Sequence, residues 1–178
     1  MERFEEFKTT ILERAKKECA CKEQYSRALK SDTFEDLMSV IKDNFLWATE
    51  NKIIDPILIN EYKQEFNGNN IWCNENARNG FLLLTGNTTA EATGNTTVEA
   101  YGNTTVEAYD NTTVRATGNT TVRAYDNTTV EAYGNAYIHS YYIIECKLKD
   151  NSIYRLISEN KIFYPEESAI KIEKQTNP

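Results

Sequence analysis

Residues that carry out catalysis or bind metals are scarce in this chain. Its 178 residues include one histidine, His139, and four cysteines: Cys19, Cys21, Cys73 and Cys146. A nucleophile needs a base within reach, which a single histidine hardly supplies. The cysteine spacing fits neither a disulfide framework nor a zinc site. We therefore expect buried, reduced thiols, no catalytic, cofactor or metal site, and no enzymatic activity.

Three further absences narrow the choice of compartment and partner. No apolar run is long enough to cross a membrane, and the first ten residues, MERFEEFKTT, lack the apolar stretch of a signal peptide. The net charge of −7 argues against a protein that binds nucleic acid by neutralising phosphates. We therefore expect a cytoplasmic protein without a membrane or nucleic-acid partner.

Glycine and proline are few as well, at 7 and 3, yet turn residues recur at a strict interval. Residues 85–132 read as six near-identical octads: TGNTTAEA, TGNTTVEA, YGNTTVEA, YDNTTVRA, TGNTTVRA and YDNTTVEA. Self-similarity at a fixed period indicates a repeat architecture. Glycine stays low because asparagine and aspartate take some of the turns.

Each octad divides into a turn and a strand when its Tyr or Thr is numbered position 1. Positions 2 and 3 are Gly or Asp followed by Asn, residues that tolerate positive φ, so they predict a tight turn. Positions 4 to 8 and the next position 1 predict a strand. Because side chains alternate along a strand, positions 4, 6 and 8 (Thr, Val, Ala) share one face, and positions 5, 7 and 1 share the other.

Two architectures fit short repeated strands. In an antiparallel meander with two-residue hairpins, the Val/Ala face would change sides at every turn, and no single core could form. A β-solenoid keeps that face inward throughout and is therefore favoured. Two octads per coil give a thin core that suits small residues. Sixteen residues per coil would also stack alternating charges at position 7, namely Glu99, Arg115, Glu131 and Lys147.

The residues before the repeat indicate helices. Apolar residues at spacings of three and four predict helices over residues 3–19 and 22–30. Ser31-Asp32, with Glu35 as a capping box, predicts the start of a helix that runs to about residue 50. Asp55-Pro56 predicts the start of another helix, which Asn67-Gly68 ends. We expect three or four helices in all.

The predicted fold is thus α+β, with a small N-terminal helical domain followed by a two-sided β-solenoid of 16 residues per coil. Its predicted parts are a helical capping domain at 1–67, a connector at 68–76, a solenoid at 77–172 and a C-terminal tail at 173–178. The octad frame can be threaded through twelve units in this solenoid, less regularly beyond residue 156. We also expect Trp72 to pack over the first coil.

The octad [YT]-[GD]-N-T-T-V-[ER]-A resembles the Y-G-N-A-T-V-x-A arrays of octapeptide-repeat proteins from gut bacteria and their mobile elements. The resemblance covers most of the chain and includes the short helical segment. It implies a phage or plasmid origin and brings no functional residue with it, because those proteins have no established activity.

The outward residues change toward the end of the array, on alternate octads. Position 5 reads Thr89, Thr105, Thr121, Tyr137, Ile153, Ala169, and position 7 reads Glu91, Glu107, Arg123, His139, Arg155, Lys171. Apolar surface rimmed by charge is typical of interaction sites. We therefore predict a protein-binding site at Tyr137, His139, Ile153, Arg155 and Lys171. Alternatively, the C-terminal tail covers these residues.

The leading functional hypothesis is a non-enzymatic protein-binding module, an inhibitor or adaptor that binds a protein partner. The alternative is a structural protein that self-assembles, end to end or as a homodimer through its C-terminal coils. DNA mimicry and ice binding are weaker alternatives, because the faces mix Glu with Arg and the outward Thr lies beside charge. On the opposite face we expect Tyr109, Tyr125 and Tyr141 to stack.

Overall fold

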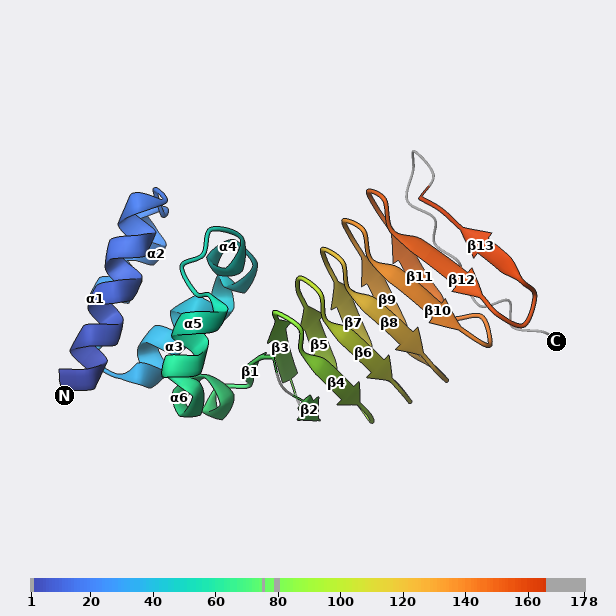
Figure 1. The fold of residues 1–178 in the computed structure, drawn as a ribbon, viewed down its shortest axis with the longest axis horizontal. Coiled ribbons are helices and arrows are strands. Elements are labelled where there is room, and N and C mark those ends of the chain that lie inside the picture. Colours follow the sequence, from blue (N-terminus) through green and yellow to red (C-terminus); the bar gives the residue numbers. More distant parts are fainter. Residues whose placement is uncertain (1, 75, 79–80, 166–178) are drawn as a thin grey trace. The chain divides into compact units, whose positions relative to one another are not determined.

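Figure 1 shows the fold in a computed structural model that describes residues 2–74, 76–78 and 81–165. The chain forms two compact units, Met1–Asn69 and Asn70–Pro178. The first is helical and the second is a β-solenoid. Throughout the described residues, no helix combines the length and apolar character needed to cross a membrane.

The helical unit has six described helices, more than the three or four predicted. They are α1 (Glu2–Lys17), α2 (Lys22–Leu29), α3 (Phe34–Asp43), α4 (Phe45–Glu50), α5 (Pro56–Glu61) and α6 (Lys63–Gly68). The helix expected to run to residue 50 is interrupted at Asn44. The side-chain amide of Asn44 donates to the Val40 carbonyl over 2.8 Å. In a continuous α-helix that carbonyl would accept the backbone N–H of Asn44 instead.

The two predicted helix starts have different outcomes. Asp55 caps α5 as predicted, because its carboxylate accepts the Leu58 N–H over 2.8 Å. The cap predicted at Ser31-Asp32 with Glu35 is wrong. The capping residue is Thr33, whose hydroxyl accepts the Asp36 N–H over 3.1 Å. The same three-residue spacing therefore applies one residue later, because α3 begins at Phe34.

The prediction of buried cysteines is right for only two of the four. Cys73 and Cys146 are buried, whereas Cys19 and Cys21 are exposed, and all four are free thiols. The helix predicted over 3–19 ends at Lys17, and Cys19 follows it with a φ of +57°. The apolar stripe of α1 therefore stops at Ala15.

The solenoid consists of two sheets of short strands, confirming the predicted two-sided coil (Figure 1). Sheet A contains β1 (Ile71–Cys73), β3 (Phe81–Thr85), β5 (Thr97–Ala100), β7 (Thr113–Ala116), β9 (Thr129–Ala132) and β11 (Glu145–Leu148). Sheet B contains β2 (Asn76–Arg78), β4 (Thr89–Ala92), β6 (Thr105–Ala108), β8 (Thr121–Ala124), β10 (Tyr137–Ser140), β12 (Ile153–Leu156) and β13 (Lys161–Phe163). From β3 to β12, each strand pairs in parallel with residues 16 positions away, for example Val98 with Val114.

The inward and outward faces follow the predicted alternation. The position 6 valines, from Val98 to Val130, have no exposed surface, and the position 8 alanines are equally buried. The buried position 4 threonines bond to the turn, as when the Thr112 hydroxyl donates to the Tyr109 carbonyl over 2.6 Å. On sheet A, Arg115 lies 3.9 Å from Glu99 and 3.4 Å from Glu131, which confirms the predicted charge alternation.

Positions 2 and 3 form the predicted turns, but the asparagines at position 3 do not adopt positive φ. Positive φ occurs at position 2, with +69° at Gly86 and +56° at Asp110, and at none of the position 3 asparagines of the described octads. Each side-chain amide instead bonds to the asparagine of the neighbouring coil, with N···O distances of 3.2 to 3.4 Å. Two asparagine ladders result: Asn87, Asn103, Asn119, Asn135 and Asn151 in one, and Asn95, Asn111 and Asn127 in the other.

Position 2 lies close to the backbone of the neighbouring coil. A Cβ added at Gly134 would lie 3.0 Å from the backbone nitrogen of Gly118. Where aspartate takes position 2, its carboxylate accepts a backbone N–H one coil away: Asp110 accepts from Gly94 and Asp150 from Gly134, each over 2.9 Å. Aspartate thus tolerates the left-handed turn and also binds a backbone donor of the preceding coil.

The ends of the solenoid depart from the octad frame. β1 lies within the segment expected to be a connector, and Trp72 packs against the solenoid core as predicted. Residues 157–164 do not form the expected coil. The chain reverses at Asn160, where φ is +50°, and β13 pairs antiparallel with β12, stacking Phe163 on Tyr154 at 5.4 Å. Of the last predicted octad, 165–172, only residue 165 is described, and the tail at 173–178 lies outside the described residues.

A first prediction concerns the asparagine ladder. Asn119 bonds to asparagines on both sides, whereas Asn151, at the end of the described ladder, bonds to one. Replacing Asn119 with Ala should lower the free energy of unfolding by about 1–2 kcal/mol, since each net hydrogen bond contributes about 0.5–1 kcal/mol at an exposed site. Asn151→Ala should cost about half as much. Urea unfolding followed by the β-sheet circular dichroism signal measures both, and equal losses would contradict the ladder.

Candidate functional site

Four of the five predicted site residues lie together on the outer face of sheet B. The parallel pairing of β10 with β12 sets Tyr137 beside Ile153 and His139 beside Arg155. The Tyr137 and His139 rings, two residues apart on one strand, stack with centroids 5.6 Å apart. Lys171 lies outside the described residues.

β13 adds a residue that the octad frame did not predict. Ile162 pairs with Arg155 across the antiparallel β12–β13 ladder, and directly opposed residues share a face of the sheet. Its side chain is 51% exposed. The alternation Lys161-Ile162-Phe163 after a turn-forming asparagine was the available signal. We call Tyr137, His139, Ile153, Arg155 and Ile162 the distal patch.

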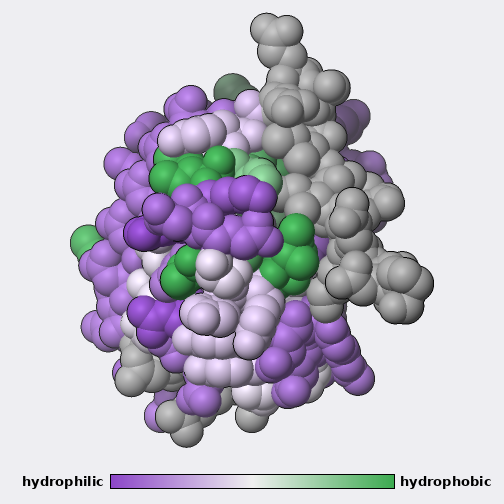
Figure 2. Space-filling view, turned by 90° about the vertical axis from the view of Figure 1, so that its right-hand side faces the viewer, coloured by the Kyte–Doolittle hydropathy of each residue, from purple (hydrophilic) through white to green (hydrophobic). Residues whose placement is uncertain are grey.

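The distal patch differs from the rest of the same face. On the neighbouring coils the outward residues are threonines and an ion pair between Arg123 and Glu107, whose atoms lie 2.8 Å apart. Arg155 forms no ion pair with any described residue. The end-on view of the solenoid shows hydrophobic surface interleaved with hydrophilic surface (Figure 2). The patch thus combines partly exposed apolar side chains with a cation that has no ion-pair partner among the described residues.

The surroundings of His139 favour its neutral form. Burial lowers its pKa below the ordinary value of 6.5, and the positive charges of Arg123 and Arg155 on the two neighbouring strands lower the pKa further. Glu107 opposes this shift. Near neutral pH the positive charge of the patch therefore belongs to Arg155 and not to the imidazole.

A buried hydroxyl cluster supports the patch from inside. Tyr154 takes an inward position held by valine in the regular octads, and its hydroxyl lies 2.7 Å from the Ser140 hydroxyl. The Ile144 N–H donates to the Tyr154 hydroxyl over 3.4 Å, and the Ser140 hydroxyl lies 2.6 Å from the Tyr142 carbonyl. These bonds satisfy the Tyr142 carbonyl and the Ile144 N–H, in a turn that lacks the usual Gly or Asp followed by Asn.

This irregular turn also exposes side chains on the other side of the solenoid. Tyr141, Tyr142 and Ile143 are 55%, 74% and 37% exposed. Tyr109 and Tyr125 stack as predicted, with centroids 4.6 Å apart and rings nearly parallel. The Tyr141 ring does not continue this parallel stack as predicted, because it packs edge-on against Tyr142 at 5.0 Å.

The hydroxyl cluster generates a stability prediction. Tyr154→Phe leaves the buried Ile144 N–H and the Ser140 hydroxyl without this partner, so the free energy of unfolding should fall by about 1–3 kcal/mol. Adding Ser140→Ala also removes the hydroxyl that donates to the Tyr142 carbonyl, so the double variant should be less stable than Tyr154→Phe alone. Chemical denaturation of both variants measures the difference. A Tyr154→Phe variant as stable as the parent chain would show that the cluster contributes nothing.

His139 gives a pH prediction that one signal can report, because the chain has no other histidine. Its NMR titration should show a pKa below 6.5, which Arg155→Gln raises and Glu107→Gln lowers. Since the folded-state pKa is the lower one, the unfolded chain binds more protons between the two values. The contribution of His139 to stability is therefore complete above pH 6.5 and is lost as the pH falls through this window. A pKa that Arg155→Gln leaves unchanged would contradict the proposed arginine effect.

Within the described residues, no cluster of three or more His, Cys, Asp or Glu side chains is placed to hold a metal ion. Burial raises the pKa of the Cys146 thiol to about 12, so this cysteine stays protonated. Comparisons of the chain with models of protein families, with curated proteins and with solved structures found no match.

Proposed function

We propose that this chain is a non-enzymatic protein-binding module and that the distal patch is its contact surface. The observation that carries this proposal is the placement of Tyr137, Ile153 and Ile162 around Arg155 on three adjacent strands. Tyrosine and arginine are the residues that most often anchor protein interfaces, and apolar neighbours exclude water around them. Parallel and antiparallel pairing on a regular sheet holds these side chains in place before a partner binds, which lowers the entropy lost on binding.

The chemistry of the patch also describes its partner. Because His139 is neutral and Arg155 has no ion pair within the described chain, a carboxylate is the complementary group, set among apolar side chains. The resemblance to octapeptide-repeat proteins of mobile elements supports a cytoplasmic inhibitor or adaptor that acts on a host protein. The partner would thus present an acidic residue at the centre of an apolar surface.

The test is affinity purification from the native host with the whole chain as bait. Tyr137→Ala combined with Arg155→Glu should abolish capture of the partner while the circular dichroism spectrum stays unchanged. Thr113→Ala combined with Arg115→Glu is the control, because it changes octad positions 5 and 7 to the same two residues on sheet A. This control replaces exposed ion pairs with like charges beside Glu99 and Glu131, a cost of about a few tenths of a kcal/mol per pair, so its circular dichroism spectrum should also stay unchanged. Equal capture by all three chains would exclude the distal patch as the contact surface.

Structural self-assembly is the second candidate, and one observation favours it. β11 is the last strand of sheet A among the described residues, so its outer edge has no described partner strand. An unpaired strand edge can pair with a second copy of the chain. Light scattering over a range of concentrations separates the two candidates, since assembly predicts a mass that rises with concentration and the protein-binding proposal predicts a constant one.

A further inference from the structure

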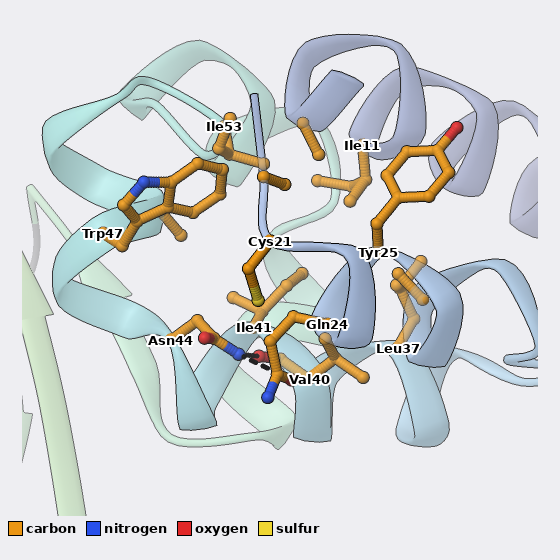
Figure 3. A pocket seen from close by; sticks show the side chains of 14 residues that line it. Ile11, Cys21, Gln24, Tyr25, Leu37, Val40, Ile41, Asn44, Trp47 and Ile53 are labelled. Atoms are coloured by element: carbon orange, nitrogen blue, oxygen red, sulfur yellow. Dashed lines mark hydrogen bonds between the residues drawn. The ribbon is translucent and has the colours of Figure 1, made fainter. Parts of the chain in front are cut away.

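The helical unit has a cavity of about 300 Å³ that is partly open to solvent and is lined by residues of α1, α2, α3, α4 and the adjoining loops. Figure 3 shows its walls, with Trp47 and Tyr25 on opposite sides and Cys21 between them. A space of this size is at the lower end of small-molecule sites, roughly 300–1,000 Å³.

The cavity arises from small side chains on several elements. Four alanines line it: Ala15 on α1, Ala20 before α2, Ala28 on α2 and Ala48 on α4. The large residues Ile11, Leu37 and Ile41 form the rest of its apolar wall together with the two aromatic rings. None of the 14 lining side chains is an acid, a lysine or an arginine. Burying a charge without a partner is costly, so this lining selects a neutral and mainly apolar occupant.

The polar part of the lining is a pair of side-chain amides. The Asn44 amide donates to the Gln24 Oε1 over 3.2 Å and to the Val40 carbonyl over 2.8 Å. The Gln24 Oε1 also accepts from Arg27 over 2.8 Å, which fixes the orientation of this amide. These bonds use the Gln24 oxygen and the Asn44 nitrogen.

One donor and one acceptor of this amide pair remain. The Gln24 Nε2 and the Asn44 Oδ1 take part in no hydrogen bond with the described residues. A carboxamide presents the complementary pair, a carbonyl oxygen for Gln24 and an N–H for Asn44. We propose that this cavity binds a small neutral molecule that combines an apolar ring with one carboxamide group. This binding activity lies in the helical unit and is independent of the distal patch.

The experiment uses the full chain and cyclohexanecarboxamide as the probe, with the indole N–H signals of the two tryptophans as reporters. The Trp47 signal should shift and saturate, whereas the Trp72 signal, in the solenoid unit, should not move. Cyclohexanecarboxylate has nearly the same shape but carries a charge. It should bind at least about tenfold more weakly, the factor that corresponds to one lost or mispaired polar contact.

Two variants separate binding in the cavity from binding elsewhere. Ala28→Leu fills the space from α2 with a good helix former, so the Trp47 shift should disappear. Gln24→Glu keeps an acceptor for Arg27 and Asn44 but removes the donor, so affinity for the amide should fall by about tenfold. The Gln24→Glu result decides the matter if Ala28→Leu fails to fold. The proposal is wrong if Trp47 does not respond to the amide, if the carboxylate binds equally well, or if the variant that folds binds like the parent.

Discussion

Each strand from β3 to β12 is hydrogen-bonded to residues 16 positions away in the sequence, and this spacing sets like positions of the octad directly above one another. Stacked asparagines can then bond amide to amide along both edges, and stacked valines fill a thin core. Stacking would also bring like charges together. On sheet A that cost is avoided because Glu99, Arg115 and Glu131 alternate in sign. The identity of almost every repeat residue thus depends on what lies one coil away.

The same dependence explains why the irregular coils matter for function. In the regular octads the backbone, the asparagines and most outward charges are satisfied by neighbouring coils, so little is left for a partner to bind. Where the turn residues are lost at 141–144, Tyr154 and Ser140 supply the missing hydrogen bonds from within. The chain then reverses at Asn160 and brings Ile162 beside Arg155. The surface available for binding is therefore greatest where the repeat is least regular.

Sequence reasoning succeeded where one local property decides the structure. The alternation of Thr, Val and Ala with polar residues determines which face is buried, and the Asp55-Pro56 signal determines where a helix starts. It failed where two local solutions compete. Asn44 can continue a helix or bond back to Val40, and residues 157–163 can extend the coil or fold back so that Phe163 packs on Tyr154.

The predicted site residues that the structure describes share one face because strand register is periodic, whereas Ile162 joins them only through that reversal. The cavity depends on alanines from four parts of the chain and has no local signal.

Cysteine cross-linking tests the 16-residue register most directly. Thr105 and Thr121 are paired on adjacent strands with outward side chains, whereas Thr105 and Thr113 lie on different sheets. With Cys19 and Cys21 replaced by serine, the chain carrying Thr105→Cys and Thr121→Cys should form an intramolecular disulfide on mild oxidation, detectable by mass spectrometry. The chain carrying Thr105→Cys and Thr113→Cys should not. A disulfide in the second chain and none in the first would contradict the coil on which the asparagine ladders and the distal patch depend.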